Sequence, residues 1–357
     1  MPDDQLIEFV EQLSGEVHLR VEENLGSGFV RLRSAEAERR QAKHDIQQVE
    51  DIVTEVLRNA RDAQASHVFI ATNREDSQRY LTIIDDGRGV PAELHTKIFE
   101  PRVTSKLDTM VMDSWGVHGR GMALYSIASN SEAASVMASA PELGCAISIE
   151  TDTELLPERS DQSTLPELRR NDLGKWEAVK GPHNIARTIV EFVLAEDQAI
   201  EVFLGSPAQI VATLMDFGQR SLKREELLFC KDISSLPVVQ RLATSGDSAE
   251  LQEGSAELGL KLSERTAHRI LAGQIEPLAP LVKSIVSAAK AKNSQQDYPL
   301  KDTRGLQISG EDTERFARAL ETAFEVLGER YYLSLIDLPK IRIKGNTISV
   351  RFDIEKE

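Results

Sequence analysis

The 357-residue sequence has few cysteines, few aromatic residues and no long apolar run. Its two cysteines, Cys145 and Cys230, are too few for a disulfide framework, which favours a reducing compartment. No stretch is apolar over the roughly 20 residues that a membrane-spanning helix needs. The opening residues MPDDQLIEFV do not resemble a signal peptide. We therefore expect a cytoplasmic protein that has no membrane partner.

The sequence also has fewer positively than negatively charged residues. The chain has 42 Lys and Arg against 58 Asp and Glu, which gives a formal net charge of −16. The overall field of such a chain does not hold nucleic acid, so a DNA contact would need a local basic surface or a partner. The hydrophobic fraction of 41% is that of an ordinary globular protein, and the length allows two or three domains.

The stretch VTEVLRNARDAQAS, residues 53–66, combines apolar helical spacing with a polar stripe. At 3.6 residues per turn, Glu55, Asn59 and Asp62 lie on one side of the helix. The neighbouring face is apolar and consists of Val53, Val56, Leu57, Ala60 and Ala63. Taken alone, the polar stripe would face solvent. It can also line a binding site.

Two further motifs follow at intervals of about thirty residues, which makes the second interpretation stronger. Asp85-Asp86-Gly87-Arg88-Gly89 comes directly after a predicted strand, and Gly116-x-x-Gly119-x-Gly121 leads into a predicted helix. An aspartate at a strand end can accept a hydrogen bond from an exocyclic amine such as that of adenine. Glycines let the backbone approach a ring, and a glycine cluster before a helix offers amides to phosphate oxygens.

The polar stripe supplies the remaining chemistry of a nucleotide site. An asparagine oxygen suits Mg²⁺, which prefers oxygen ligands. A glutamate one turn earlier can orient and deprotonate a water molecule that attacks the terminal phosphate. Each motif alone is a weak signal, but their order and context predict a site for a nucleotide.

Over residues 45–200 these motifs resemble the Bergerat ATP-binding fold of the GHKL superfamily, which includes DNA gyrase, heat-shock chaperones, sensor histidine kinases and MutL proteins. The resemblance implies that Glu55 is the general base, that Asn59 is the Mg²⁺ ligand and that Asp85 binds adenine. It also implies an ATP lid from about Phe99 to Val117, in which Lys106 can supply a catalytic positive charge. The residues expected to contact ATP are Asn59, Asp62, Asp85, Gly87, Gly89, Val90, Thr104, Ser105, Gly116, Val117, His118, Gly119, Arg120, Gly121 and Met122.

Within the superfamily, the segment IFEPRVTSK is similar both to the phenylalanine box of histidine kinases and to the lid of MutL proteins and type II topoisomerases. We interpret His44 as a surface or core histidine, not a phosphoacceptor, which disfavours the kinase branch. The sequences GRGMALYSIAS, ISIETDTELLP and KGPHNIARTIVEFVL resemble the ATPase domain of the topoisomerase VI B subunit. Asn184 and Ile185 depart from the Gly-Thr that is usual there.

The expected fold class is α+β: a Bergerat ATP-binding α/β sandwich, a helical module and a small C-terminal α/β segment. The expected domains are residues 1–203, with an N-terminal helical extension, residues 204–294 and residues 295–357. Residues 67–72 and 80–85 predict an antiparallel hairpin, and residues 131–139, 145–151 and 187–194 predict further strands. Residues 1–50 are expected to be helical apart from a break at LGSG, and residues 152–180 to form a polar loop.

Two parts outside the ATP-binding domain allow more than one interpretation. The sequence AELGLKLSERTAHRILAGQ resembles a helix–two-turn–helix module, which either packs on the ATPase domain or binds DNA through Arg265, His268 and Arg269. The basic residues Lys223, Arg224 and Lys231 would extend such a surface, although Glu225 and Glu226 dilute it. In a C-terminal transducer domain, Lys301, Lys340 and Lys344 are candidates for a lysine that reaches ATP.

The sequence therefore predicts an Mg²⁺-dependent ATPase that forms a homodimer when ATP is bound. The favoured role is the ATPase subunit of a topoisomerase VI-like complex, acting on DNA with a separate DNA-cleaving subunit. The alternatives are a MutL-like clamp ATPase and a non-catalytic or histidine-kinase-like regulator that binds ATP and signals through protein contacts.

Overall fold

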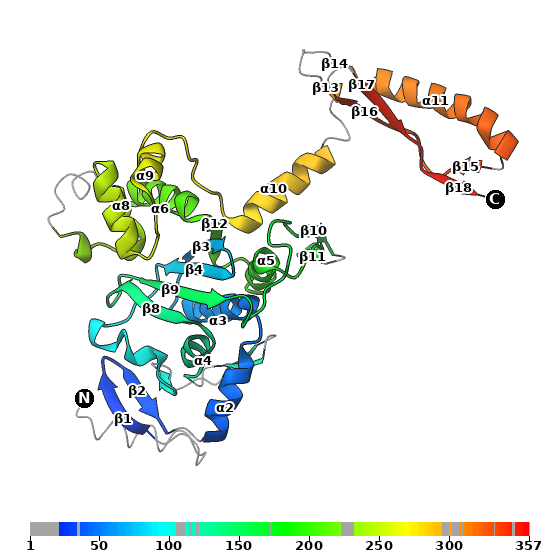
Figure 1. The fold of residues 1–357 in the computed structure, drawn as a ribbon. Coiled ribbons are helices and arrows are strands. Elements are labelled where there is room, and N and C mark those ends of the chain that lie inside the picture. The colour runs from blue at the N-terminus through cyan, green and yellow to red at the C-terminus, as the bar shows by residue number, and fades with distance from the viewer. Residues whose placement is uncertain are drawn as a thin grey trace. The chain divides into compact units, whose positions relative to one another are not determined.

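The computed structural model divides the chain into two compact units, Met1–Val286 and Ser287–Glu357 (Figure 1). The residues that it describes are 21–33, 36–104, 111–113, 116–118, 121–171, 173–222, 232–294, 300–301, 307–308, 310–331, 333–344 and 347–356. Within these ranges, no helix has the length and apolar character needed to span a bilayer.

A five-stranded mixed sheet forms the centre of the first unit, in the order β12-β3-β4-β9-β8. Its strands are β3 (His67–Glu75), β4 (Gln78–Asp85), β8 (Ala133–Ser139), β9 (Cys145–Asp152) and β12 (Glu201–Gly205). The edge strand β12 runs parallel to β3, and the other pairs are antiparallel. The predicted hairpin is confirmed, with a register that runs from Val68 opposite Asp85 to Glu75 opposite Gln78. The strands expected near 131–139 and 145–151 are confirmed as well.

Helices cover both faces of this sheet (Figure 1). Strand β3 is apolar on both sides, since Val68 and Ile70 belong to one buried cluster while Phe69 and Ala71 belong to the other. The first cluster includes residues of α3 (Val49–Asp62), α4 (Ala123–Asn130), α5 (Ile185–Ala195) and the start of α10 (Leu281–Ser294). The second includes residues of α6 (Pro207–Ser221), η4 (Val238–Thr244), α8 (Ser248–Glu257) and α9 (Glu264–Leu271). The α+β class predicted from the sequence is confirmed.

The predicted helical extension is wrong over residues 21–32, where the chain forms a hairpin of β1 (Val21–Gly26) and β2 (Phe29–Leu32). Gly26 and Gly28 both have positive φ, which favours a tight turn. A helix follows at α2 (Glu36–Asp45), as expected. Residues 1–20 of the predicted extension lie outside the described ranges.

The strand predicted at residues 187–194 is also wrong, because this segment lies within helix α5. Asn184 caps the helix by accepting a hydrogen bond from the Arg187 N–H at 3.0 Å. The buried residues Ile185, Ile189, Val190 and Phe192 follow helical spacing. Their β-branched and aromatic side chains favour a strand locally, but burial of one helical face against the sheet decides the structure.

The polar segment 152–180 is partly the expected loop. It also contains a hairpin of β10 (Glu167–Arg170) and β11 (Trp176–Lys180). The loop before this hairpin is anchored by Glu158, whose carboxylate accepts two hydrogen bonds of 2.7 Å from Arg79. Glu50, which is buried in the first turn of α3, accepts hydrogen bonds from Arg159 N and Gln162 Nε2. These contacts fix the start of α3.

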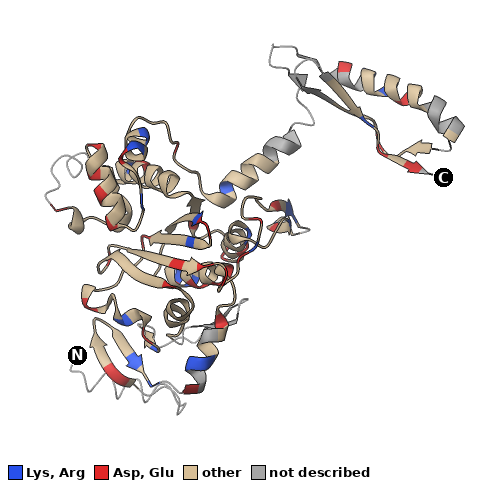
Figure 2. Ribbon diagram, in the orientation of Figure 1, with Lys and Arg blue, Asp and Glu red and all other residues tan. Residues whose placement is uncertain are grey.

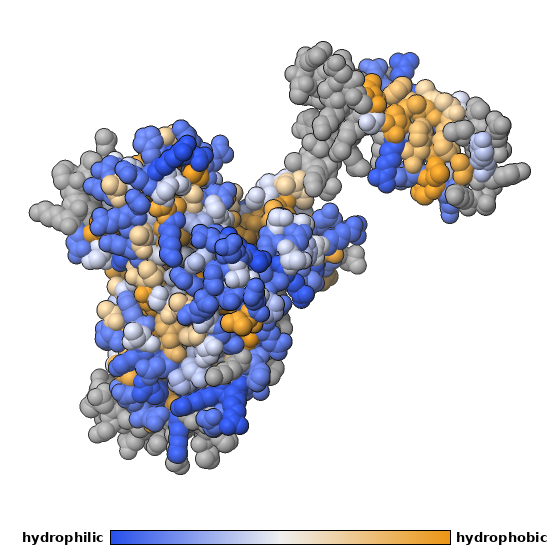
Figure 3. All heavy atoms as spheres, in the orientation of Figure 1, coloured by the Kyte–Doolittle hydropathy of each residue, from blue (hydrophilic) through white to orange (hydrophobic). Residues whose placement is uncertain are grey.

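The second unit is a small α/β unit, described here by itself. Helix α11 (Gly310–Tyr331) and the hairpin of β16 (Lys340–Lys344) and β17 (Thr347–Arg351) confirm the sequence prediction. The remaining strands form two short pairs, β13 (Leu300–Lys301) with β14 (Gln307–Ile308), and β15 (Leu333–Leu335) with β18 (Ile354–Lys356). Hydrophobic side chains gather on one face of the unit (Figure 3), and Phe316, Ile336, Leu338, Ile348 and Ile354 are exposed.

Candidate nucleotide-binding site

Helix α3 holds the polar stripe in place through its opposite, apolar face. The helix starts at a capping box, in which the Asp51 carboxylate accepts hydrogen bonds from Gln47 N and Gln48 N. Its buried apolar residues, Ile52, Val53, Val56, Leu57 and Ala60, belong to the cluster under the sheet. The predicted amphipathic helix is therefore confirmed, and Glu55, Asn59 and Asp62 remain partly accessible on one stripe.

A buried arginine binds the candidate base. Arg58 Nη1 lies 2.5 Å from Glu55 Oε1, and the two side chains are 7% and 21% exposed. The pair fixes the direction of the Glu55 carboxylate. Sequence reasoning missed this partner, although Arg58 lies three residues after Glu55, a spacing that places two helical side chains side by side.

Asn59 passes a simple test of fit for a magnesium–phosphate group. Its Nδ2 atom is buried, and no described residue accepts a hydrogen bond from it. A buried amide without a partner costs free energy, so the side chain gains from a ligand that satisfies it. An asparagine amide offers its oxygen to Mg²⁺ and its N–H groups to a phosphate oxygen.

Asp62 takes part in an ionic link between helices. Its carboxylate lies 3.1 Å from Arg61 Nε, and Arg61 Nη1 lies 2.7 Å from a Glu196 carboxylate oxygen just beyond α5. This network braces the end of α3 against α5. The contact of Asp62 with ATP stays a prediction.

Asp85, at the end of β4, is the most strongly perturbed carboxyl group near α3. Burial raises its pKa to about 7, although the hydrogen bond that Oδ1 accepts from Gly87 N at 2.8 Å opposes the shift. A buried carboxyl at a strand end is costly when ionised, unless a donor reaches it. A donor such as an exocyclic amine would stabilise the ionised form here.

The turn after Asp85 is joined directly to the end of α3. Arg88 N donates a hydrogen bond of 2.9 Å to Ala63 O, and a Cβ atom built at Gly87 would lie 2.9 Å from the Ala63 Cβ. At Gly89, φ is +67° and a Cβ would lie 2.0 Å from Ala140 O. Only glycine fits these two approaches, so the structure brings the first two motifs together.

The hydrogen bonds of Asp86 differ from those of Asp85. Its carboxylate accepts hydrogen bonds from Ser66 N at 2.7 Å and His67 N at 2.8 Å, and it lies 2.7 Å from His67 Nδ1. Burial opposes ionisation, but these three hydrogen bonds lower the pKa of Asp86. The pairing joins residues nineteen positions apart. Sequence reasoning assigned no function to it, since only the fold brings the start of β3 beside the end of β4.

The third motif starts a helix that packs beside α3. Gly121 has φ +66°, and a Cβ there would lie 2.8 Å from Val103 O. Gly121 O accepts a hydrogen bond of 2.8 Å from Arg102 N, and the buried Met122 immediately precedes α4. Because α4 contacts α3, this end of the motif lies on the same side of the sheet as the polar stripe.

The expected lid is described only in part. It begins at the last residue of the short helix η2 (Lys97–Phe99), which follows η1 (Ala92–Leu94). It contains β5 (Val103–Thr104) and β6 (Val111–Asp113) and ends within β7 (Gly116–His118). Thr104 is buried and pairs with Val30 of β2. The backbone of Gly116, Val117 and His118 pairs with β6. Ser105, Lys106, Gly119 and Arg120 lie outside the described residues.

Val90 is held by a neighbouring strand. Its N–H donates a hydrogen bond of 2.7 Å to Ser139 Oγ, and its carbonyl oxygen lies 3.2 Å from His95 Nε2. Ser139 in turn donates to Gly144 O at 2.8 Å. The backbone after Gly89 is therefore fixed against the loop that joins β8 and β9.

Part of the chain that contains these motifs matches a known protein family. Residues 44–154 match the sequence model of the histidine kinase-, DNA gyrase B-, and HSP90-like ATPase family, a span that contains α3, the Asp85–Gly89 turn and Gly121. The chain contains a GHKL-type ATPase domain. The mixed sheet and its helices agree with the α/β sandwich of such a domain, and the GHKL domain supports ATP binding.

The other two comparisons give little further similarity. No curated protein matches the chain. A crystal structure of full-length ShkA in complex with AMPPNP covers 57% of this chain at 14% identity, with a TM-score of 0.22. The match spans 46% of the ShkA chain, less than half of its length. At this TM-score the likeness supports no finer assignment.

The candidate DNA surface stays a prediction. In the helix pair, Arg265, His268 and Arg269 of α9 are exposed, whereas α8 carries acidic residues (Figure 2). Ala267 and Ile270 of α9 are buried in the second cluster, on the face of the sheet opposite α3. The helix pair therefore packs against the GHKL domain. Lys223, Arg224 and Lys231 lie outside the described residues, and the side chains of Lys301, Lys340 and Lys344 are likewise not described.

Proposed function

We propose that this chain is a Mg²⁺-dependent ATPase whose GHKL domain binds ATP beside α3. The observation that carries the proposal is the connection of the two central motifs. The helix that bears Glu55 and Asn59 on one stripe is hydrogen-bonded at its end to the glycine turn that follows the buried Asp85. A chain that only needed a stable fold would gain nothing from a carboxyl group with so high a pKa at this point.

Each residue then has a distinct chemical role. Asp85 accepts a hydrogen bond from the adenine amine, and Gly87 leaves room for the ring. Asn59 holds Mg²⁺ through its amide oxygen, and the metal neutralises negative charge on the phosphates when bound. Glu55, held by Arg58, orients a water molecule toward the terminal phosphate and accepts its proton. The lid residues Ser105 and Lys106 and the glycines before α4 hold the phosphates.

ATP-gated dimerisation is part of the proposal. The N-terminal hairpin is attached to the base of the lid, because β2 pairs with β5 and Leu32 N donates to Arg102 O at 3.0 Å. Arg31 of the same hairpin forms ion pairs with Glu23 and with Glu100. A lid ordered by ATP would therefore order the N-terminal segment, and a second copy would dock on it. Size-exclusion chromatography of a variant that lacks residues 1–33, which leaves α3 and its cap intact, with a non-hydrolysable ATP analogue, tests this step. A dimer that forms undiminished would refute it.

The cellular role that we favour is the ATPase subunit of a topoisomerase VI-like complex with a separate DNA-cleaving subunit. Its support is the sequence GRGMALYSIAS at the start of α4 and the α8–α9 pair that follows the ATP-binding region. Affinity purification of the full chain with ATP tests this role. Recovery of a DNA-cleaving subunit is the expected result, whereas recovery of a response regulator would favour an ATP-binding signalling protein. A mismatch-repair partner would favour the MutL-like clamp.

The ATPase assignment is tested by phosphate release from ATP and Mg²⁺, with Glu55→Gln as the variant. Loss of turnover by about 100-fold or more is expected, since removal of a general base costs this much. ATP binding should persist in the variant. Excess EDTA should stop turnover by the unchanged protein. Turnover that survives Glu55→Gln would exclude Glu55 as the base.

A further inference from the structure

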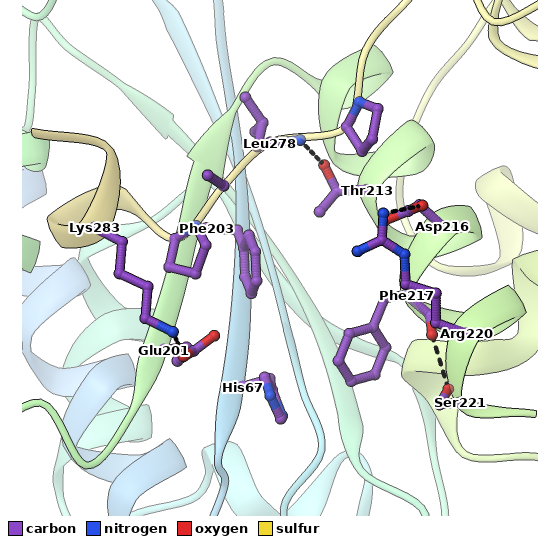
Figure 4. A pocket seen from close by; sticks show the side chains of 13 residues that line it. His67, Glu201, Phe203, Thr213, Asp216, Phe217, Arg220, Ser221, Leu278 and Lys283 are labelled. Atoms are coloured by element: carbon purple, nitrogen blue, oxygen red, sulfur yellow. Dashed lines mark hydrogen bonds and ion pairs between the residues drawn. The ribbon is translucent and has the colours of Figure 1, made fainter. Parts of the chain in front are cut away.

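A cavity lies on the face of the sheet opposite α3, and none of the motifs described above accounts for it. Its volume is about 540 Å³, within the range of roughly 300–1,000 Å³ that is typical of small-molecule sites. It is bounded by β3 and β12, by the last turns of α6 and by residues 277–283 (Figure 4). All of these segments belong to the first compact unit.

The inner part of the cavity is aromatic and apolar. Phe203 of β12, Phe217 of α6 and Leu278 line it, together with the ring of His67 (Figure 4). The His67 and Phe217 rings are 4.8 Å apart between centroids and tilted by 59°. Such a surface suits a flat, apolar body, because rings bury much apolar area in specific geometries.

The polar groups of the cavity are arranged in two ion pairs. Arg220 Nη2 lies 2.8 Å from Asp216 Oδ1, and Lys283 is paired with Glu201. Both cations are mostly exposed, while about two thirds of each carboxylate side chain is buried. A guanidinium has five N–H donors and an ammonium has three, so each cation can bind a further anion and keep its carboxylate. Asp216 and Glu201 are already paired with these cations.

His67 adds a third group that favours an anion. Its hydrogen bond to Asp86 raises the pKa of the imidazole, although burial opposes the shift. Glu201 raises and Lys283 lowers the same pKa by their charges. Since Nδ1 is turned toward Asp86, Nε2 is the ring nitrogen left for a ligand, and it donates when the ring is protonated.

We propose that this cavity is a binding site for a small aromatic carboxylate. The aromatic body lies on Phe217 and Phe203, and the carboxylate is held at the rim by the cations Arg220 and Lys283. A single negative charge fits better than a doubly charged phosphate, because Asp216 and Glu201 already balance the charges of Arg220 and Lys283.

One hydrogen bond joins the cavity to the turn of residues 85–89, where we propose that the nucleotide binds. His67 binds Asp86, and Asp86 lies between Asp85 and Gly87 in the chain. A ligand that contacts His67 therefore acts on the position of the adenine-binding segment. This step rests on the proposed ATP-binding function: the carboxylate serves as an effector of ATP binding, and by linkage ATP changes the affinity for the carboxylate by the same factor.

The experiment is calorimetric titration of the full chain, without nucleotide, by three probes of one shape. These are 2-naphthylacetate, the neutral 2-naphthylacetamide and the cationic 2-(2-naphthyl)ethylamine. We expect the acetate to bind at least about tenfold more tightly than the amide, with no binding of the amine. Equal binding of all three, or no binding of the acetate at millimolar concentration, would overturn the proposal.

Three variants place the binding in this cavity. Arg220→Gln should weaken 2-naphthylacetate binding about fivefold, as expected for a lost charge-assisted hydrogen bond. Arg40→Gln is its matched control, because Arg40 is 77% exposed against 76% for Arg220 and also pairs with a carboxylate one turn earlier. Ala279→Trp should fill the cavity and abolish binding, and its unchanged melting temperature would show that the fold is intact. Acetate binding that survives both Arg220→Gln and Ala279→Trp would refute the site.

The effector role has its own readout. The Kd for ATP is measured with and without saturating 2-naphthylacetate, and a change of about threefold or more is expected in the unchanged protein but not in Ala279→Trp. An unchanged Kd for ATP would refute the coupling through Asp86.

Discussion

Arg58 Nη1 lies 2.5 Å from Glu55 Oε1, with both residues on helix α3 and the guanidinium almost completely buried. Glu55 is the proposed general base, so this contact fixes the direction in which its carboxylate can meet a water molecule. Arg58 is thus a positioning residue. It is too deeply buried to be a surface ion pair of negligible energy.

Replacement of Arg58 should slow catalysis without removing nucleotide binding. In Arg58→Met we expect kcat to fall by about tenfold or more, because a misoriented base loses most of its advantage, while KM changes little. Arg58→Lys should recover part of kcat, since it retains the charge but not the fork geometry. Steady-state kinetics checks the split. A rise in KM at constant kcat would mean that Arg58 binds substrate and does not position Glu55.

The raised pKa of Asp85 predicts pH-dependent ATP binding. Below about pH 7 the carboxyl is protonated, and a neutral carboxyl is a weaker acceptor for the adenine amine than a carboxylate. The Kd for ATP should therefore rise as pH falls below 7, by up to about tenfold per pH unit, and level off above it. Titration of Asp85→Asn is the control, since the titration of ATP itself is common to both proteins. The slope below pH 7 should be absent in this variant, and an equal slope in both would contradict the assignment.

The same group should cost stability in the ligand-free protein. Its folded pKa is raised above the unfolded value, so the folded state binds the proton more tightly and loses stability as pH rises toward 7. Asp85→Asn removes this cost and should stabilise the ligand-free chain at pH 8 by up to about 4 kcal/mol. The gain should shrink toward pH 5. Denaturant unfolding at the two pH values measures it, and a destabilised Asp85→Asn at pH 8 would contradict the burial argument.

Much of this candidate site could be predicted from the sequence, because its residues lie in short motifs whose spacing fits one helix or the end of one strand. Glu55 and Asn59 are one helical turn apart, and Asp85 ends a run of β-branched and aromatic residues, so local spacing and composition are enough to predict both elements. The contact between Arg58 and Glu55 was not predicted, because it depends on the directions that the two side chains take. The Asp86–His67 pair was not predicted either, because it depends on how β3 and β4 are paired.

The incorrect fold predictions have physical causes of the same kind. Residues 187–194 are rich in β-branched residues and were predicted as a strand, but α5 buries one helical face under the sheet. The β12 edge strand beside β3 was assigned no strand character. That α6 and α9 cover the second face of the sheet depends on contacts far apart in sequence, and neither composition nor periodicity indicates such contacts.

The close approach at Gly89 gives a prediction for stability. A Cβ atom there would collide with Ala140 O, so Gly89→Ala should destabilise the fold by more than about 3 kcal/mol. Gly273→Ala is the matched control, because Gly273 has a similar φ of +69° but nothing within 4 Å of a Cβ. Its cost should be only about 1–2 kcal/mol, that of the backbone conformation alone. Denaturant unfolding compares the two, and equal losses would show that the approach of Gly89 to the β8–β9 loop is not tight.

We propose that ATP binds at the turn formed by Asp85, Gly87 and Gly89, beside α3. Calorimetric titration of the full chain with ATP and Mg²⁺ at pH 8, alongside Asp85→Ala, measures whether this turn holds the nucleotide. We expect the unchanged protein to bind one ATP per chain and Asp85→Ala to bind at least about tenfold more weakly while remaining folded. Equal ATP affinity in the two proteins, or no binding by the unchanged chain, would exclude this turn as the ATP site.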